Sequence, residues 1–247
     1  MGKNSMKRIL LALLVMALAI SETACSSKSK SNDAENETVD SSISNTGKIS
    51  NGTEESEEAE QALAKLLSGN EKYLSGSITP NVEASLRTDL ATNGQHPYAI
   101  VLTCSDSRVP AELIFDSSLG DIFVIRTAGN VVSDFEIGSV EYAAEHLGSP
   151  LVFVLGHTNC GAVTAAVEGG DAGGKIQSIV NEIEPSVQKA KDADAEDVLS
   201  KAIEINVMNS VDKILSSDII NELMEEDKVE VVGGVYDINT GAITIIE

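Results

Sequence analysis

Short hydrophobic runs that alternate with helical patterns constrain this chain more than any other feature. Three runs are rich in β-branched residues, and a polar or glycine-containing loop closes each of them: Tyr98–Thr103, Ile122–Arg126 and Leu151–Leu155. Continuous apolar runs of this length are typical of parallel strands that are buried on both faces. Because helical segments lie between them, the sequence predicts an α/β fold with a mostly parallel central sheet flanked by helices.

Apolar residues at three-to-four spacing predict the flanking helices. We expect helices over 58–74, 82–90, 135–146, 161–167 and 175–190, a long helix that starts in 192–197 and continues through Ile214, and a short one near 219–224. Lys228–Tyr236 and Ala242–Ile246 flank the turn Asp237–Gly241, which predicts a C-terminal hairpin or edge strand.

Residues 1–24 have the features of an export signal. Three basic residues precede the apolar run Ile9–Ile20, and small and polar residues follow it. A helix of that run rises only about 18 Å, whereas a bilayer core is about 30 Å thick. We therefore expect an exported protein without a permanent membrane span; a buried core helix is the alternative interpretation.

Cys25 follows Thr23-Ala24 and resembles the acylated cysteine of bacterial lipoproteins. The cleavage site of such lipoproteins usually has an aliphatic residue where this chain has Glu22. The competing interpretation is cleavage near Ala19, which would give a secreted or periplasmic protein. Residues 25–57 are rich in Ser, Asn and Glu and lack aromatic side chains, which predicts a flexible acidic tether before a catalytic domain at 58–247.

The overall charge excludes some partner classes. Seventeen basic residues against 39 acidic ones give a net charge of −22, which disfavours nucleic acid and anionic membrane surfaces. We expect membrane contact only through a lipid anchor. Three cysteines cannot form a disulfide framework, so each requires its own explanation.

Two predicted strand ends carry a set of residues that can bind a metal. Cys104 directly follows the first strand, and His157 and Cys160 follow the third with ligand-like spacing. Neighbouring parallel strands could bring these three side chains together. Two sulfurs and an imidazole form a soft set that suits zinc, with a fourth place for water or for Asp106.

The motifs CSDSRVP and GHTNCGAV, with RTAGN between them, resemble those of β-class carbonic anhydrases, and the resemblance extends from about Glu58 to Glu247. It implies that Cys104, His157 and Cys160 bind one catalytic Zn²⁺ per subunit. It further implies reversible hydration of carbon dioxide to bicarbonate and a proton by zinc-bound hydroxide, with Asp106 and Arg108 as a catalytic pair beside the metal.

The resemblance also assigns substrate-pocket positions to Gln95, Phe123, Ala128 and Tyr142. In the family such pockets lie at a dimer interface, so a homodimer or a higher even oligomer is expected. The residues alone favour core packing for Phe123 and Tyr142.

The state of Asp106 is left open by the resemblance, because this residue either ligates zinc and closes the site or pairs with Arg108. Some bacterial members close the site through a bicarbonate pocket that uses a Trp; this chain has Val101 there, although Arg126 remains, which favours the open site. His96 could act as a proton shuttle. Two other functions are compatible with the residues: hydrolysis of carbonyl sulfide or carbon disulfide, and a non-catalytic zinc-stabilised binding domain.

Overall fold

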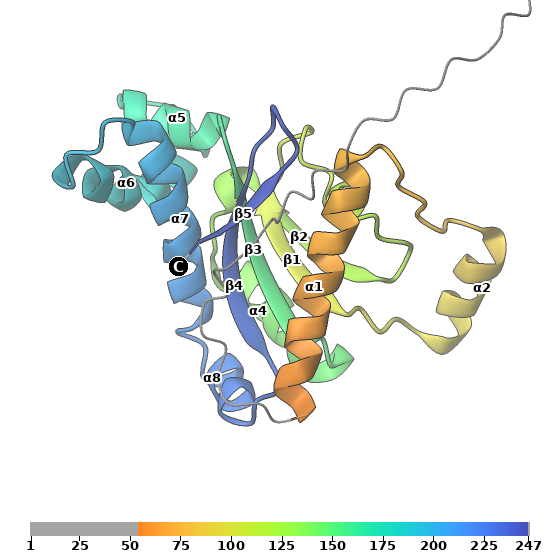
Figure 1. Ribbon diagram of the computed structural model, residues 1–247. Coiled ribbons are helices and arrows are strands. Elements are labelled where there is room, and N and C mark those ends of the chain that lie inside the picture. Colours follow the sequence, from red (N-terminus) through yellow and green to blue (C-terminus); the bar gives the residue numbers. More distant parts are fainter. Residues whose placement is uncertain (1–53, 247) are drawn as a thin grey trace, which may run out of the picture. The chain divides into compact units, whose positions relative to one another are not determined.

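A five-stranded sheet forms the centre of the computed structural model, which describes residues 54–246 (Figure 1). The strand order is β2-β1-β3-β4-β5. The strands are β1 (Ala99–Cys104), β2 (Ile122–Thr127), β3 (Leu151–His157), β4 (Glu230–Tyr236) and β5 (Ile243–Ile246). The first four are parallel and β5 is antiparallel to β4, which confirms the predicted α/β class and the antiparallel C-terminal strand at the sheet edge.

Helices cover both faces of the sheet (Figure 1). They are α1 (Glu54–Leu74), α2 (Ala84–Asn93), α3 (Ala111–Ile114), α4 (Asp134–Glu141), α5 (Gly161–Glu168), α6 (Ile176–Asp192), α7 (Val198–Ile214) and α8 (Asp218–Glu225). A 3-10 turn at Ala128–Asn130 follows β2, and a π-helical turn at Tyr142–His146 continues α4.

Alternation along the strands divides the core between the two faces. Ile100 and Leu102 of β1 pack with residues of α4, α7 and α8, whereas Val101 packs with residues of α1 and α3. All six residues of β1 and all seven of β3 are buried. Burial on both faces is what their continuous apolar sequence predicts, and it fixes the ends of these strands rigidly.

Several predicted boundaries were wrong by a few residues. The first helix begins at Glu54 rather than Glu58, because acidic residues are favourable near the positive end of a helix. The segment 192–197 does not start the long helix: α6 ends at Asp192, and Asp197 caps α7 by accepting a hydrogen bond from the Ser200 N–H. The predicted helix 135–146 changes to π geometry at Tyr142.

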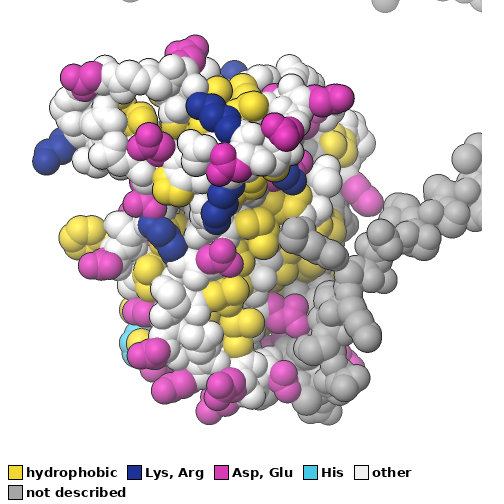
Figure 2. All heavy atoms as spheres, turned by 90° about the vertical axis from the view of Figure 1, so that its left-hand side faces the viewer, with side chains coloured by type: hydrophobic (Ala, Val, Ile, Leu, Met, Phe, Trp, Pro, Cys, Tyr) yellow, Lys and Arg dark blue, Asp and Glu magenta, His cyan; other side chains and the backbone are white. Residues whose placement is uncertain are grey.

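The face formed by α6, α7 and α8 carries charged side chains of both signs (Figure 2). Basic side chains gather over its upper part among acidic ones, and acidic side chains dominate the lower part near α8. No helix in the described part of the chain combines the length and the apolar character needed to cross a membrane.

Candidate metal centre

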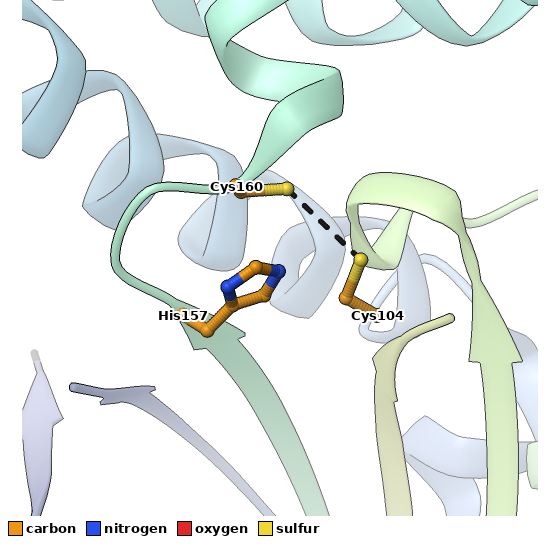
Figure 3. A group of neighbouring side chains, drawn as sticks. All are labelled: Cys104, His157 and Cys160. Carbon is orange, nitrogen blue, oxygen red and sulfur yellow. Dashed lines mark hydrogen bonds between the residues drawn. The ribbon is translucent and has the colours of Figure 1, made fainter. Parts of the chain in front are cut away.

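Two neighbouring strand ends and the helix that follows one of them bring three side chains together. Cys104 is the last residue of β1 and His157 is the last of β3, while Cys160 directly precedes α5. Because β1 and β3 pair in parallel, their carboxyl ends meet at one edge of the sheet. Figure 3 shows the two sulfur atoms pointing toward each other, with the imidazole of His157 directed at them.

The spacing of these side chains suits a shared metal ion. One ligand atom from each residue lies within 4.8 Å of the others, and all three residues are buried. The Cys104 and Cys160 Sγ atoms are 4.0 Å apart. Two thiolates bound to one tetrahedral zinc ion at about 2.3 Å would be about 3.8 Å apart, whereas a disulfide requires about 2.05 Å.

His157 offers a nitrogen that lacks a partner within the protein. Its Nδ1 is 2.9 Å from the Thr158 carbonyl oxygen, which can only accept, so Nδ1 donates and carries the ring proton. The Nε2 atom is then a lone-pair acceptor, and it is buried with no hydrogen-bond partner among residues 54–246. A buried polar atom without a partner is costly, and a metal ion would satisfy it. The donor set therefore fits a bound zinc ion.

The two thiols share one hydrogen bond, which shifts the pKa of each. The pKa of Cys104 is lowered chiefly because the Cys160 S–H donates a hydrogen bond to it, and the same bond raises the pKa of Cys160. The pair by itself therefore favours one thiolate and one thiol. A divalent cation would release the second proton, since metal ligation requires deprotonated sulfur.

Asp106 and Arg108 lie beside the three ligands and grip each other. The Asp106 Oδ1 atom accepts from the Arg108 main-chain N–H at 2.9 Å and from Nε at 3.0 Å, and Oδ2 accepts from Nη2 at 2.8 Å. This forked interaction lowers the pKa of Asp106 to about 2. Oδ2 is also 3.9 Å from His157 Nε2, so an ionised carboxylate oxygen lies next to the ligand set.

The end of β2 supports the Cys104–Asp106 segment. The Arg126 guanidinium donates to the Cys104 carbonyl at 3.1 Å and to the Asp106 carbonyl at 2.6 Å. The Gly129 N–H donates to the Cys104 sulfur at 3.2 Å. Gly129 was not predicted as a site residue. The glycine in RTAGN could have indicated it, because its φ of +70° is a conformation that favours glycine.

Ala128 is the one predicted pocket residue at the metal end of the chain's own sheet. It begins the 3-10 turn that follows β2, directly before Gly129. The β2 strand reaches the same edge of the sheet because Thr127 pairs with Cys104.

Gln95, Phe123 and Tyr142 lie at the opposite end of the sheet. Phe123 pairs with Ile100 of β1. Ile100 precedes Cys104 by four residues of the strand, which is a distance of about 13 Å. Its ring centroid is 6.3 Å from that of Tyr142. Gln95 precedes β1, and His96 beside it shares that position. These residues therefore do not line the metal centre of their own chain.

Comparisons with known proteins agree with this geometry. The family model described as carbonic anhydrase matches residues 99–243. Carbonic anhydrase 2 of Mycobacterium tuberculosis is 38% identical over 189 residues, which cover 73% of this chain and 89% of that protein. The carbonic anhydrase of Mycolicibacterium smegmatis is 43% identical over 131 residues, covering 51% and 63%.

Solved structures match as well. The β-carbonic anhydrase CcaA has a TM-score of 0.62 at 26% identity, with 76% of this chain and 88% of that chain covered. A tetrameric β-carbonic anhydrase of Sordaria macrospora has a TM-score of 0.60 at 25% identity, with 75% and 97% covered.

Proposed function

The chain belongs to the β-class carbonic anhydrases, and we propose that Cys104, His157 and Cys160 hold one Zn²⁺ per chain. The reaction is the reversible hydration of carbon dioxide to bicarbonate and a proton. The observation that carries the metal assignment is the buried, unpartnered Nε2 of His157 beside two sulfurs 4.0 Å apart.

Zinc suits this donor set better than other common divalent ions. Two thiolates and a neutral imidazole are soft or intermediate ligands, whereas magnesium and calcium require oxygen. When bound, zinc supplies Lewis acidity, which lowers the pKa of bound water from 15.7 towards about 7 and makes a hydroxide nucleophile accessible.

Asp106 is proposed to orient the attacking water. Arg108 holds the carboxylate ionised, with Oδ2 facing the ligand side of the pair. From there Oδ2 can accept a hydrogen bond from water and so fix the direction of the water's lone pair. Both oxygens already accept from Arg108, which supports the open arrangement in which Asp106 does not ligate the metal.

We propose a homodimer or higher even oligomer whose subunits share their sites. Gln95, Phe123 and Tyr142 lie too far from Cys104 of their own chain to contact its substrate. Phe135 is 86% exposed and Tyr142 is 48% exposed, which is unusual for large aromatic side chains. A second copy docked along the β2 edge of the sheet would cover these side chains. It would also bring its own metal centre close to the pocket residues of the first copy.

Export and lipid attachment are further proposals, and Cys25 and the signal lie outside the described residues. The support is the sequence pattern of residues 1–57. Incorporation of labelled palmitate into the native chain and its loss in Cys25→Ser would support the anchor. Equal labelling of both chains would contradict it.

Metal analysis combined with turnover of three substrates tests the proposed function. We expect about one zinc per purified chain and carbon dioxide hydration that exceeds hydrolysis of carbonyl sulfide and carbon disulfide on the same sample. Faster carbonyl sulfide or carbon disulfide turnover would favour a hydrolase. Zinc without turnover of any of these substrates would favour a binding domain.

A further inference from the structure

Two buried polar side chains on α7 face the turn that follows β2. Asn206 and Ser210 are each only 3% exposed, on a helix whose neighbouring positions Ile203 and Val207 pack in the apolar core. Asn206 Nδ2 donates to the Gly129 carbonyl at 2.8 Å, and Ser210 Oγ donates to the Asn130 carbonyl at 2.9 Å. Burying an amide here is unfavourable unless it is hydrogen-bonded. The proposed reaction assigns no role to either residue.

The turn held by these side chains reaches the metal centre. Gly129, whose carbonyl accepts from Asn206, donates its own N–H to the Cys104 sulfur at 3.2 Å. A side chain at Gly129 would place its Cβ 2.8 Å from Ile183 Cδ1 and 3.0 Å from the Ala162 Cβ. Close packing and the φ of +70° together favour glycine at this position.

The side-chain nitrogen of Asn130, which lies in the turn, does not help to hold it. Asn130 Nδ2 is buried and has no hydrogen-bond partner within residues 54–246. Asn130 also has a φ of +47°, which is uncommon outside glycine. The bonds from α7 to the carbonyls of Gly129 and Asn130 therefore hold the turn, together with its packing against Ile183 and Ala162.

We propose that Asn206 is a positioning residue for the metal centre: through Gly129 it keeps an N–H donor on the Cys104 sulfur. An N–H bond withdraws electron density from a metal-bound thiolate. The sulfur then donates less to the metal, which remains a stronger Lewis acid. The inference rests on the proposed metal centre. It adds to that centre a residue that lies 102 positions after Cys104 in the sequence.

Two substitutions with opposite packing effects separate this role from simple stabilisation. Asn206→Ala leaves a cavity, whereas Asn206→Leu fills the space with an apolar side chain of similar size. Both remove the donor to Gly129. Ser210→Ala is the matched control, because it removes the buried 2.9 Å hydrogen bond to the Asn130 carbonyl of the same turn but leaves the 2.8 Å bond from Asn206 to the carbonyl of Gly129.

The test uses the full chain loaded with Co²⁺, whose sulfur-to-cobalt charge-transfer absorption reports the electron density on sulfur. We expect this band to shift to longer wavelength in both Asn206 variants and to keep its wild-type position in Ser210→Ala. With Zn²⁺, carbon dioxide hydration by the Asn206 variants should fall about 10- to 100-fold, as for other outer partners of metal ligands.

Wild-type band positions in a folded Asn206 variant, or an equal shift in Ser210→Ala, would overturn the inference. Circular dichroism identifies the folded variants, and one folded Asn206 variant is sufficient. Failure of the proposed function looks different, because the unmodified chain would then lack either the charge-transfer band with Co²⁺ or carbon dioxide hydration with Zn²⁺.

Discussion

Arg108 joins the two loops that carry the metal ligands. Its guanidinium donates to both oxygens of Asp106 and, at 3.3 Å, to the main-chain carbonyl of Asn159. Asn159 lies between His157 and Cys160 with a φ of +54°, a conformation that Asn tolerates better than most residues. One side chain therefore sets the direction of the carboxylate and also links it to the second loop.

Substituting Asp106 should reduce catalysis with little effect on metal binding. Asp106→Asn keeps the shape but removes the charge and one acceptor, so we expect kcat/KM for carbon dioxide hydration to fall by about 10² or more. Zinc content should remain near one per chain, because the three ligands are unchanged. Asp212→Asn, on the exposed side of α7, is the control. Stopped-flow rates equal to those of the unmodified chain would contradict the role of Asp106.

The ligands and the Asp106–Arg108 pair could be predicted from the sequence, but the more distant groups that hold them could not. Cys104 and His157 end apolar strands and Cys160 follows His157 closely, so a local pattern indicates where the chain places them. The supports from Gly129 and Asn206 depend on contacts between segments that are far apart in the chain. Local spacing carries no information about such contacts.

Asp116, just after the end of α3, connects that helix to α1 and to the loop that follows α1. Its side chain is 3% exposed, accepts from Lys72 Nζ of α1 at 2.9 Å and also accepts from the Thr79 N–H. The hydrogen bond from Lys72 is the main reason that the pKa of Asp116 is lowered. A carboxylate with a lowered folded-state pKa stabilises the fold above its unfolded pKa of about 3.9.

Asp116→Asn should therefore destabilise the protein in a pH-dependent way. At pH 7 we expect the free energy of unfolding to fall by about 1 to 2 kcal/mol, as for loss of a hydrogen bond to a charged group. The difference from wild type should shrink as the pH falls below about 4 and the wild-type carboxylate becomes protonated. Urea denaturation at pH 7 and pH 3 measures both values. A difference that grows on acidification would be inconsistent with this account.

A pair of glycines tests the packing of α1 against α3. At Gly69 an added Cβ would lie 2.0 Å from the Phe115 carbonyl oxygen, whereas at Gly138 of α4 no atom lies within 4 Å. We expect Gly69→Ala to cost about 1 to 3 kcal/mol or more, and Gly138→Ala to be neutral or stabilising by up to about 1 kcal/mol. Melting temperatures from calorimetry compare the two. Equal effects would show that the close approach at Gly69 does not matter.

The order of elements could be predicted because hydrophobic period separates strands from helices. Short or irregular elements could not: α3 has only four residues, too few for a helical period. The π-helical turn at Tyr142–His146 keeps an apolar pattern close to that of an α-helix, so its change of geometry leaves no clear mark in the sequence. The helix boundary at Asp197 depends on a side-chain cap within a run of equally acidic candidates.

For the whole molecule, the distribution of pocket residues over two ends of the sheet predicts that mixed oligomers regain activity. One chain would carry Cys160→Ser, which removes a ligand, and the other Gln95→Ala with Tyr142→Ala, which removes pocket side chains. In a mixed dimer, one site combines an intact metal centre with intact pocket residues. Differently tagged, co-expressed chains allow its purification. Hydration no faster than the mean of the two parent oligomers would mean that sites are not shared.

Zinc-dependent carbon dioxide hydration can be tested by the stopped-flow rate of the metal-free chain before and after one equivalent of Zn²⁺. The thiol pair and the free Nε2 of His157 predict negligible turnover at pH 8.5 without metal and full recovery with zinc. Recovery should be absent in Cys160→Ser. Rapid hydration by the metal-free chain, or no hydration after zinc is bound, would show that zinc at this site does not drive the reaction.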